Sequence, residues 1–95
     1  MTHEDFNRLY DAGEIIVKVY SGVINETEKS IEAFEYGGKF YLRIHSIFKY
    51  TLDRTTECGK RYRMSKENHF IKEFDNREHA NNYFKKAAHG LTRVL

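Results

Sequence analysis

With 95 residues and a formal net charge of +2, the chain has room for one compact domain but not for two. Its seven Phe and seven Tyr residues exclude an intrinsically disordered chain, which would be poor in aromatic side chains. The longest apolar run is Ile15-Ile16-Val17, far short of the roughly twenty residues of a transmembrane helix. Because there is no secretory signal and Cys58 is the single cysteine, we expect one domain over residues 1–95 in the reducing cytoplasm.

Charge is distributed unevenly along the chain. Residues 1–59 carry seven basic and ten acidic side chains, a net of −3, whereas residues 60–95 carry nine basic and four acidic ones, a net of +5. Such an asymmetry is found in proteins that bind nucleic acid or an acidic protein, and also on ordinary solvated surfaces. Charge alone does not choose between these interpretations.

The first ten or so residues are predicted to form a short helix. Thr2 is a favoured N-cap residue, and Asp5 three residues later completes a variant of the capping box. Gly13 can adopt the left-handed conformation that ends a helix. The apolar side chains repeat with the spacing of one helix face: Phe6, Leu9 and Tyr10. Residues 15–24 then alternate as in a strand, with Lys18 and Tyr20 on one side.

A β-hairpin gives the strongest local signal. Strand-like runs at residues 30–36 and 39–50 flank Gly37-Gly38, which suit a type I′ turn because that turn needs positive φ at both positions. In the resulting register, residues whose numbers sum to 75 face each other. One face is largely apolar: Ile31, Ala33, Phe40, Leu42, Ile44, Phe48 and Tyr50. The other mixes aromatic and charged groups: Glu32, Phe34, Tyr36, Lys39, Tyr41, Arg43, His45 and Lys49.

The remaining residues predict one or two strands and a helix. Residues 53–60 read as a polar loop, and residues 61–74 as one long strand interrupted at Asn68 or as two short strands. Asp75 is the predicted N-cap of the last helix, with Glu78 completing a capping box. The helix has one apolar stripe: Ala80, Tyr83, Phe84, Ala87, Ala88 and Leu91. Gly90 ends the helix, or residues 91–95 continue it or fray.

This order of elements predicts an α+β fold. We expect an antiparallel sheet of about four strands, with the short N-terminal helix and the longer C-terminal helix packed on the face that holds Leu42 and Ile44. The opposite face is then open or covered by a partner.

No catalytic, metal or cofactor motif emerges. The five histidines, His3, His45, His69, His79 and His89, lack the spacing of metal ligands. Cys58 has basic neighbours but no assigned base or oxyanion site, and no helix start follows Gly37-Gly38 to bind phosphate. We therefore expect no cofactor, no metal and no catalytic residues.

The mixed hairpin face is the candidate binding surface. Its predicted partner-binding residues are Phe34, Tyr36, Tyr41, Arg43, His45 and Lys49, which either Lys18 and Tyr20 or Arg61 and Arg63 extend. Tyr and Arg are enriched in protein-binding hot spots, whereas aromatic platforms with Lys and Arg bind nucleic acid. A third interpretation is metal-free RNA cleavage, with His45 as general acid or base, and a homodimer interface is a fourth.

We expect a small non-enzymatic binding protein, an inhibitor or modulator that occupies the surface of a protein partner. We expect no association with a membrane. Small free-standing α+β proteins with such a face are similar in size and style to accessory proteins of phages and mobile elements, which often block a host or defence protein. A nucleic-acid-binding module is the alternative, and a metal-free ribonuclease is the second alternative.

Overall fold

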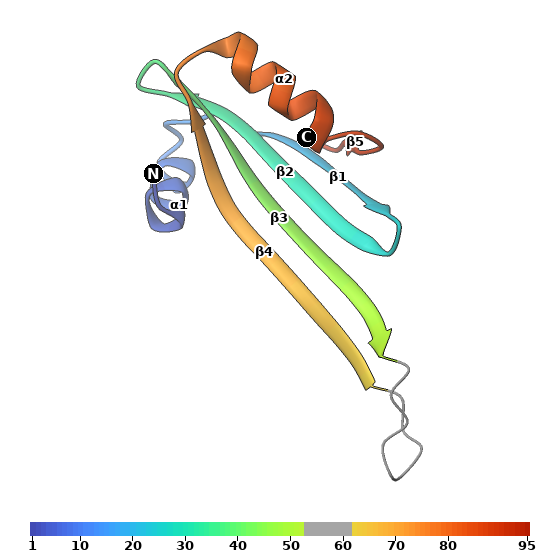
Figure 1. Cartoon of the computed structure of the whole chain (residues 1–95). Coiled ribbons are helices and arrows are strands. Elements are labelled where there is room, and N and C mark those ends of the chain that lie inside the picture. The colour runs from blue at the N-terminus through green and yellow to red at the C-terminus, as the bar shows by residue number, and fades with distance from the viewer. Residues whose placement is uncertain (53–61) are drawn as a thin grey trace.

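The protein folds as one five-stranded antiparallel sheet with a helix on each face (Figure 1). The computed structural model describes the backbone of residues 1–52 and 62–95, and the side chains of residues 1–48 and 65–95. The elements are α1 (His3–Asp11), β1 (Lys18–Ile24), β2 (Thr27–Tyr36), β3 (Lys39–Leu52), β4 (Tyr62–Phe74), α2 (Arg77–Ala87) and β5 (Thr92–Arg93). The strand order is β4-β3-β2-β1-β5, which confirms the predicted α+β class with five strands rather than about four.

Several predicted features lie outside the described residues. The polar loop at 53–60, with Cys58, is one of them, and Arg61 is another. The side chains of Lys49 and Arg63 are likewise outside, although the β3–β4 register places both residues on the same sheet face as His45.

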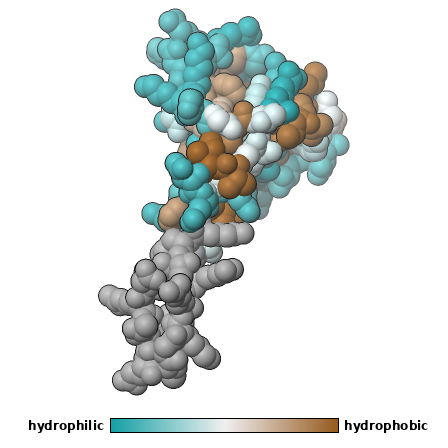
Figure 2. Space-filling model, turned by 90° about the vertical axis from the view of Figure 1, so that its right-hand side faces the viewer, coloured by the Kyte–Doolittle hydropathy of each residue, from teal (hydrophilic) through white to brown (hydrophobic). Residues whose placement is uncertain are grey.

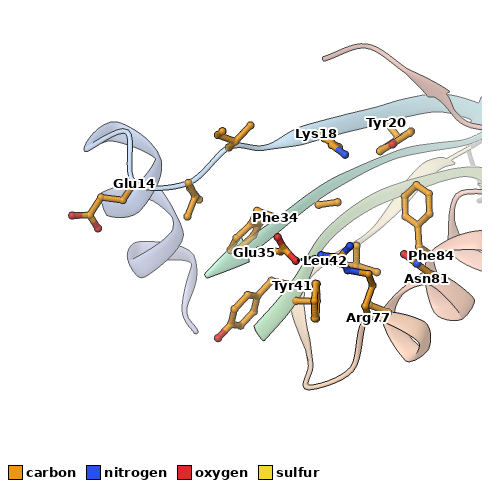
Figure 3. A pocket seen from close by; sticks show the side chains of 15 residues that line it. Glu14, Lys18, Tyr20, Phe34, Glu35, Tyr41, Leu42, Arg77, Asn81 and Phe84 are labelled. Atoms are coloured by element: carbon orange, nitrogen blue, oxygen red, sulfur yellow. Dashed lines mark hydrogen bonds and ion pairs between the residues drawn. The ribbon is translucent and has the colours of Figure 1, made fainter. Parts of the chain in front are cut away.

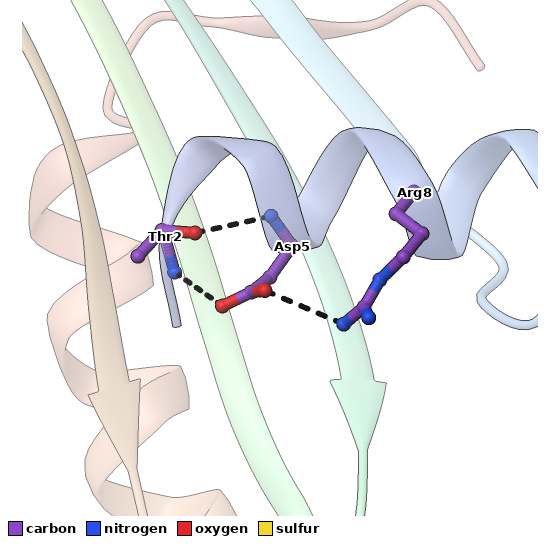
Figure 4. A network of polar contacts seen from close by, with 3 residues as sticks. All are labelled: Thr2, Asp5 and Arg8. Atoms are coloured by element: carbon purple, nitrogen blue, oxygen red, sulfur yellow. Dashed lines mark hydrogen bonds and ion pairs between the residues drawn. The ribbon is translucent and has the colours of Figure 1, made fainter.

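The predicted capping box starts α1 (Figure 4). The Thr2 hydroxyl accepts a hydrogen bond from the Asp5 backbone N–H, and the Asp5 carboxylate accepts one from the Thr2 N–H, both at 3.1 Å. The Thr2 backbone N–H first, and then the Thr2 side chain, lower the pKa of the Asp5 carboxyl by hydrogen bonding to it. Gly13 follows the helix at φ +70°, and the Glu14 N–H donates to the Leu9 carbonyl at 2.9 Å. The helix therefore ends in a Schellman motif at the predicted glycine.

The predicted hairpin register is confirmed for β2 and β3. Phe34 lies opposite Tyr41 and Glu32 lies opposite Arg43. Gly37 and Gly38 both have positive φ, +61° and +77°, as the two-residue turn requires. The long strand predicted over 61–74 is the single strand β4, whereas β1 begins only at Lys18, where its pairing with β2 starts.

The last helix differs from its prediction at both ends. Its N-cap is Asn76, whose side chain accepts from the Glu78 N–H at 2.7 Å, while the Asp75 carboxylate lies 3.8 Å from the Lys39 ammonium. Gly90, at φ +81°, turns the chain after the helix, and residues 92–93 pair with β1 as β5. Residues 91–95 therefore neither extend the helix nor fray freely.

The two helices cover opposite faces of the sheet. The apolar stripe of α2 packs on Ile31, Leu42 and Ile44, as predicted. The prediction that α1 joins it there is wrong, because Phe6 and Leu9 of α1 pack instead on Phe34 and Tyr41 from the other face. The mixed hairpin face offers two adjacent aromatic rings, and burying them with Phe6 and Leu9 is favourable. The sheet thus has two small cores, one on each side.

Candidate functional site

The centre of the predicted binding face is a core. Phe34 and Tyr41 are only 5% and 7% exposed, and their rings stack with centroids 5.2 Å apart. The Phe6 ring of α1 covers this pair, with its centroid 5.2 Å from that of Phe34. The expectation that this part of the face is open is therefore wrong, because α1 occupies it.

Arg43 is also committed within the fold. Its guanidinium lies 3.9 Å from the centroid of the Phe6 ring, and its Nη2 lies 2.7 Å from Glu32 Oε1. Both side chains of this ion pair are largely shielded from solvent, at 17% and 20% exposed. The arrangement ties β2, β3 and α1 together and leaves little of the arginine charge for a partner.

The hairpin end of the same face is more open. Tyr36 is 43% exposed there, next to Lys39, whose ammonium lies 2.7 Å from Glu73 Oε1. That hydrogen bond raises the pKa of Lys39 and lowers the pKa of Glu73. The Tyr41 hydroxyl also donates to Glu73, at 3.4 Å, and burial raises the pKa of Tyr41. The charged groups at this end are thus paired with one another.

The rings of three histidines from distant parts of the sequence lie against one another at tilted angles. The His69 ring centroid lies 4.0 Å from that of His3 and 4.6 Å from that of His45. Each outer ring has its own acceptor: His3 donates to the His69 carbonyl at 3.3 Å, and His45 donates to Glu67. Burial, and then the charges of His3 and His45, lower the pKa of His69.

The three histidines do not form a metal site with other described residues. Within residues 1–52 and 62–95, no three side chains of the ligating types could hold a metal ion. Of the groups expected to assist His45 in RNA cleavage, Tyr41 is buried, Arg43 is held by Glu32, and Arg61 lies outside the described residues. The sequence does not indicate that these histidines meet, because no short turn motif sets the β3–β4 register that places His45 opposite His69.

The proposed extension by Lys18 and Tyr20 lies on the opposite side of the sheet. These residues pair with Ala33 and Ile31, which point toward α2, and the Tyr20 ring meets Phe84 edge-on at 4.7 Å. They line an open groove of about 650 Å³ between α2, the end of β2 and the chain before β1 (Figure 3). Arg77 of α2 crosses its rim to reach Glu35, at 2.9 Å. Among the described residues that line the groove, the only ion pair is that of Arg77 with Glu35.

A second part of the α2 face reaches α2 only at its edge, where the Lys72 ammonium lies 4.3 Å from the centroid of the Tyr83 ring. We call it the basic sheet surface, and it comprises Lys29, Ser46, Phe48, Lys66, Asn68, Phe70 and Lys72. Phe48 and Phe70 are each 41% exposed, an unusual exposure for two phenylalanines on one sheet face. The alternation of these residues in β3 and β4 is visible in the sequence, but the choice of face depends on where the helices pack.

The lysines on the α2 side contrast with the cations on the α1 face. Lys39, Arg43 and His45 on the α1 face each meet a glutamate. On the α2 side, no described carboxylate lies within ion-pair distance of six lysines: Lys18, Lys29, Lys66, Lys72, Lys85 and Lys86. Among the described side chains, unpaired lysines thus lie on the α2 side of the sheet, whereas the sheet cations of the α1 face are paired.

The side that carries β5 has no broad apolar patch. Figure 2 shows its apolar side chains in small groups separated by hydrophilic ones. Val23, Val94 and Leu95 are the strongly exposed apolar residues near this edge. Recognition by a large hydrophobic surface is thus not indicated on this side, and charge is its more prominent feature.

No family model matches the chain, and comparisons with curated proteins and with solved structures also find no match. No helix in the described part of the chain is long and apolar enough to cross a membrane. The residues themselves therefore have to indicate the function.

Proposed function

We propose that this protein is a non-enzymatic binding protein that engages an anionic partner through the α2 side of its sheet. The observation that carries the proposal is the set of six lysines on that side that face no described carboxylate. Solvated cations gathered on one surface create a positive potential that attracts and orients an anionic partner. The described cations of the α1 face, Lys39, Arg43 and His45, do not serve this purpose, because each is already paired with a glutamate.

This proposal keeps a binding role but moves it to a different surface. The sequence predicts that Phe34 and Tyr41 contact the partner, but both residues are buried under α1. An inhibitor or modulator that occupies a partner's surface remains a proposal, now with an acidic surface as its target. Pairing into a homodimer also stays a prediction.

Elution from immobilised heparin, a generic polyanion, tests the proposal. The double variant Lys29→Gln/Lys66→Gln removes two unpaired charges from the α2 side and is expected to elute at clearly lower salt than the wild type. The matched control is Arg8→Gln/Lys39→Gln, which removes two charges from the α1 side, where both are paired with carboxylates. The net charge falls equally in both variants. Equal shifts in elution would contradict the proposal, because net charge rather than a specific side would then govern binding.

A further inference from the structure

Resting on the proposed function, we infer that the anionic partner is a single-stranded nucleic acid, bound across the basic sheet surface. The inference starts from Phe70, which lies on β4 opposite Ile44. No aromatic contact engages its ring within the described residues, and the ring is 41% exposed. A half-exposed ring on an open sheet face is a platform on which a base can stack.

Lysines stand beside the exposed rings. Lys72 is two residues from Phe70 on the same strand and face, where its ammonium lies 4.3 Å from the centroid of the Tyr83 ring, and Lys66 lies directly opposite Phe48 across the β3–β4 pair. Lys29 faces the same side from β2, opposite Ser46. Each ring therefore has a cation within reach of the phosphate next to a stacked base, which is the combination that single-strand-binding surfaces use.

The spacing of the rings favours a single strand over a duplex. Phe48 is four residues along β3 from Ile44, the partner of Phe70, so the two ring positions are roughly 13 Å apart along the strands. Bases in a duplex stack about 3.4 Å apart and present only their edges in the grooves. Two rings at this separation can stack on bases only when the strand is extended and its bases are free.

The composition of the surface separates nucleic acid from an acidic protein. Besides its rings and lysines, the basic sheet surface holds only the neutral polar side chains of Ser46 and Asn68. No described carboxylate belongs to this surface. Phosphates require cations and tolerate few acids, whereas a protein partner normally meets both signs of charge. Two acids of the hairpin lie outside this surface: Glu32 is on the α1 face and Glu35 is paired with Arg77.

Fluorescence anisotropy with labelled oligo(dT), oligo(U) and a duplex of equal length tests the inference on the full chain. Binding to either single strand, tighter than to the duplex, is expected. Phe70→Ala should weaken it roughly 5- to 150-fold through the lost base stack. The matched control is Tyr36→Ala, an aromatic side chain of similar exposure on the α1 face, which should bind as the wild type does. Preference for one oligonucleotide then tells RNA from DNA.

Salt dependence provides a second variant that does not rely on the aromatic ring. Lys29→Gln/Lys66→Gln should reduce the slope of log affinity against log salt by about 1.4, since each phosphate contact on a single strand contributes about 0.7. Equal binding by Phe70→Ala and the wild type, or tighter binding to the duplex, would overturn the inference. Heparin retention that depends on Lys29 and Lys66, without binding to any oligonucleotide, would overturn it while leaving the proposed function intact. If heparin retention does not depend on Lys29 and Lys66 and no oligonucleotide binds, both the inference and the proposed function are overturned.

Discussion

Replacing Phe34 by Ala tests whether α1 covers the hairpin face. Phe34 is 5% exposed and its ring lies between those of Phe6 and Tyr41, with both centroids 5.2 Å away. Removing a buried phenylalanine ring from such a site costs about 3–5 kcal/mol. A domain of this size has a total stability of roughly 5–14 kcal/mol, so the variant loses a large share of it.

Thermal unfolding followed by circular dichroism measures this loss. A change of 1 kcal/mol moves the melting temperature of a small domain by about 4–8 °C, so Phe34→Ala should melt at least roughly 12 °C below the wild type. Tyr36→Ala, two residues along the same strand and on the same face but 43% exposed, should cost less than about 1 kcal/mol. The same melting temperature for both variants would refute the reasoning, because the face would then be open.

A double variant identifies α1 as the covering element. If each single substitution removes the contact between Phe6 and Phe34, the double variant Phe6→Ala/Phe34→Ala should lose less free energy of unfolding than the sum of the two single losses. Strict additivity would instead show that the two rings contribute independently, and that another segment buries Phe34.

Three further predictions concern titration, backbone and charge. The unfolded chain protonates His69 before the folded chain does, because the pKa of His69 is lowered in the fold. Stability should therefore fall as the pH drops below about 6.5, and the pH dependence of the melting temperature should flatten in His69→Gln; parallel curves would contradict this. Gly38→Ala places a side chain at φ +77° and should lower the free energy of unfolding by about 1 kcal/mol, which is measured as a lower urea midpoint. An unchanged midpoint would show that the turn adapts. Glu32→Gln leaves the shielded Arg43 without its carboxylate and should cost about 1–3 kcal/mol, while Glu35→Gln, from an exposed pair, should stay within about 0.5 kcal/mol. Equal urea midpoints for these two variants would show that shielding makes no difference to the Arg43 pair.

The parts of the fold that the sequence predicts are those set by local chemistry. The Gly37-Gly38 turn imposes the β2–β3 register, because two consecutive residues at positive φ admit few alternatives. Thr2 and Asp5 likewise determine the start of α1 without help from the rest of the chain.

The features that the sequence does not predict depend on contacts between distant segments. The α1 helix could bury Phe6 on either face, since both faces of the hairpin carry large side chains, and only the packed structure shows that Phe34 and Tyr41 receive it. The β5 strand is too short to be read from a pattern, because its pairing depends on the turn at Gly90 rather than on its own residues.

The same placement of α1 separates stability from binding. On the α1 face, aromatic and charged side chains meet partners within the fold, so their removal should lower the melting temperature. On the basic sheet surface, Lys66 is exposed and forms no ion pair with a described carboxylate, and Phe70 is 41% exposed with no aromatic contact among the described residues. Their removal should therefore change binding and leave the melting temperature within a few degrees. Had the lysines served only to keep the protein soluble, the described cations of the α1 face would be expected to be unpaired as well. Concentration of unpaired cations on the side that also exposes phenylalanine is what a site for an anionic, base-bearing ligand requires, and solubility alone requires no exposed ring.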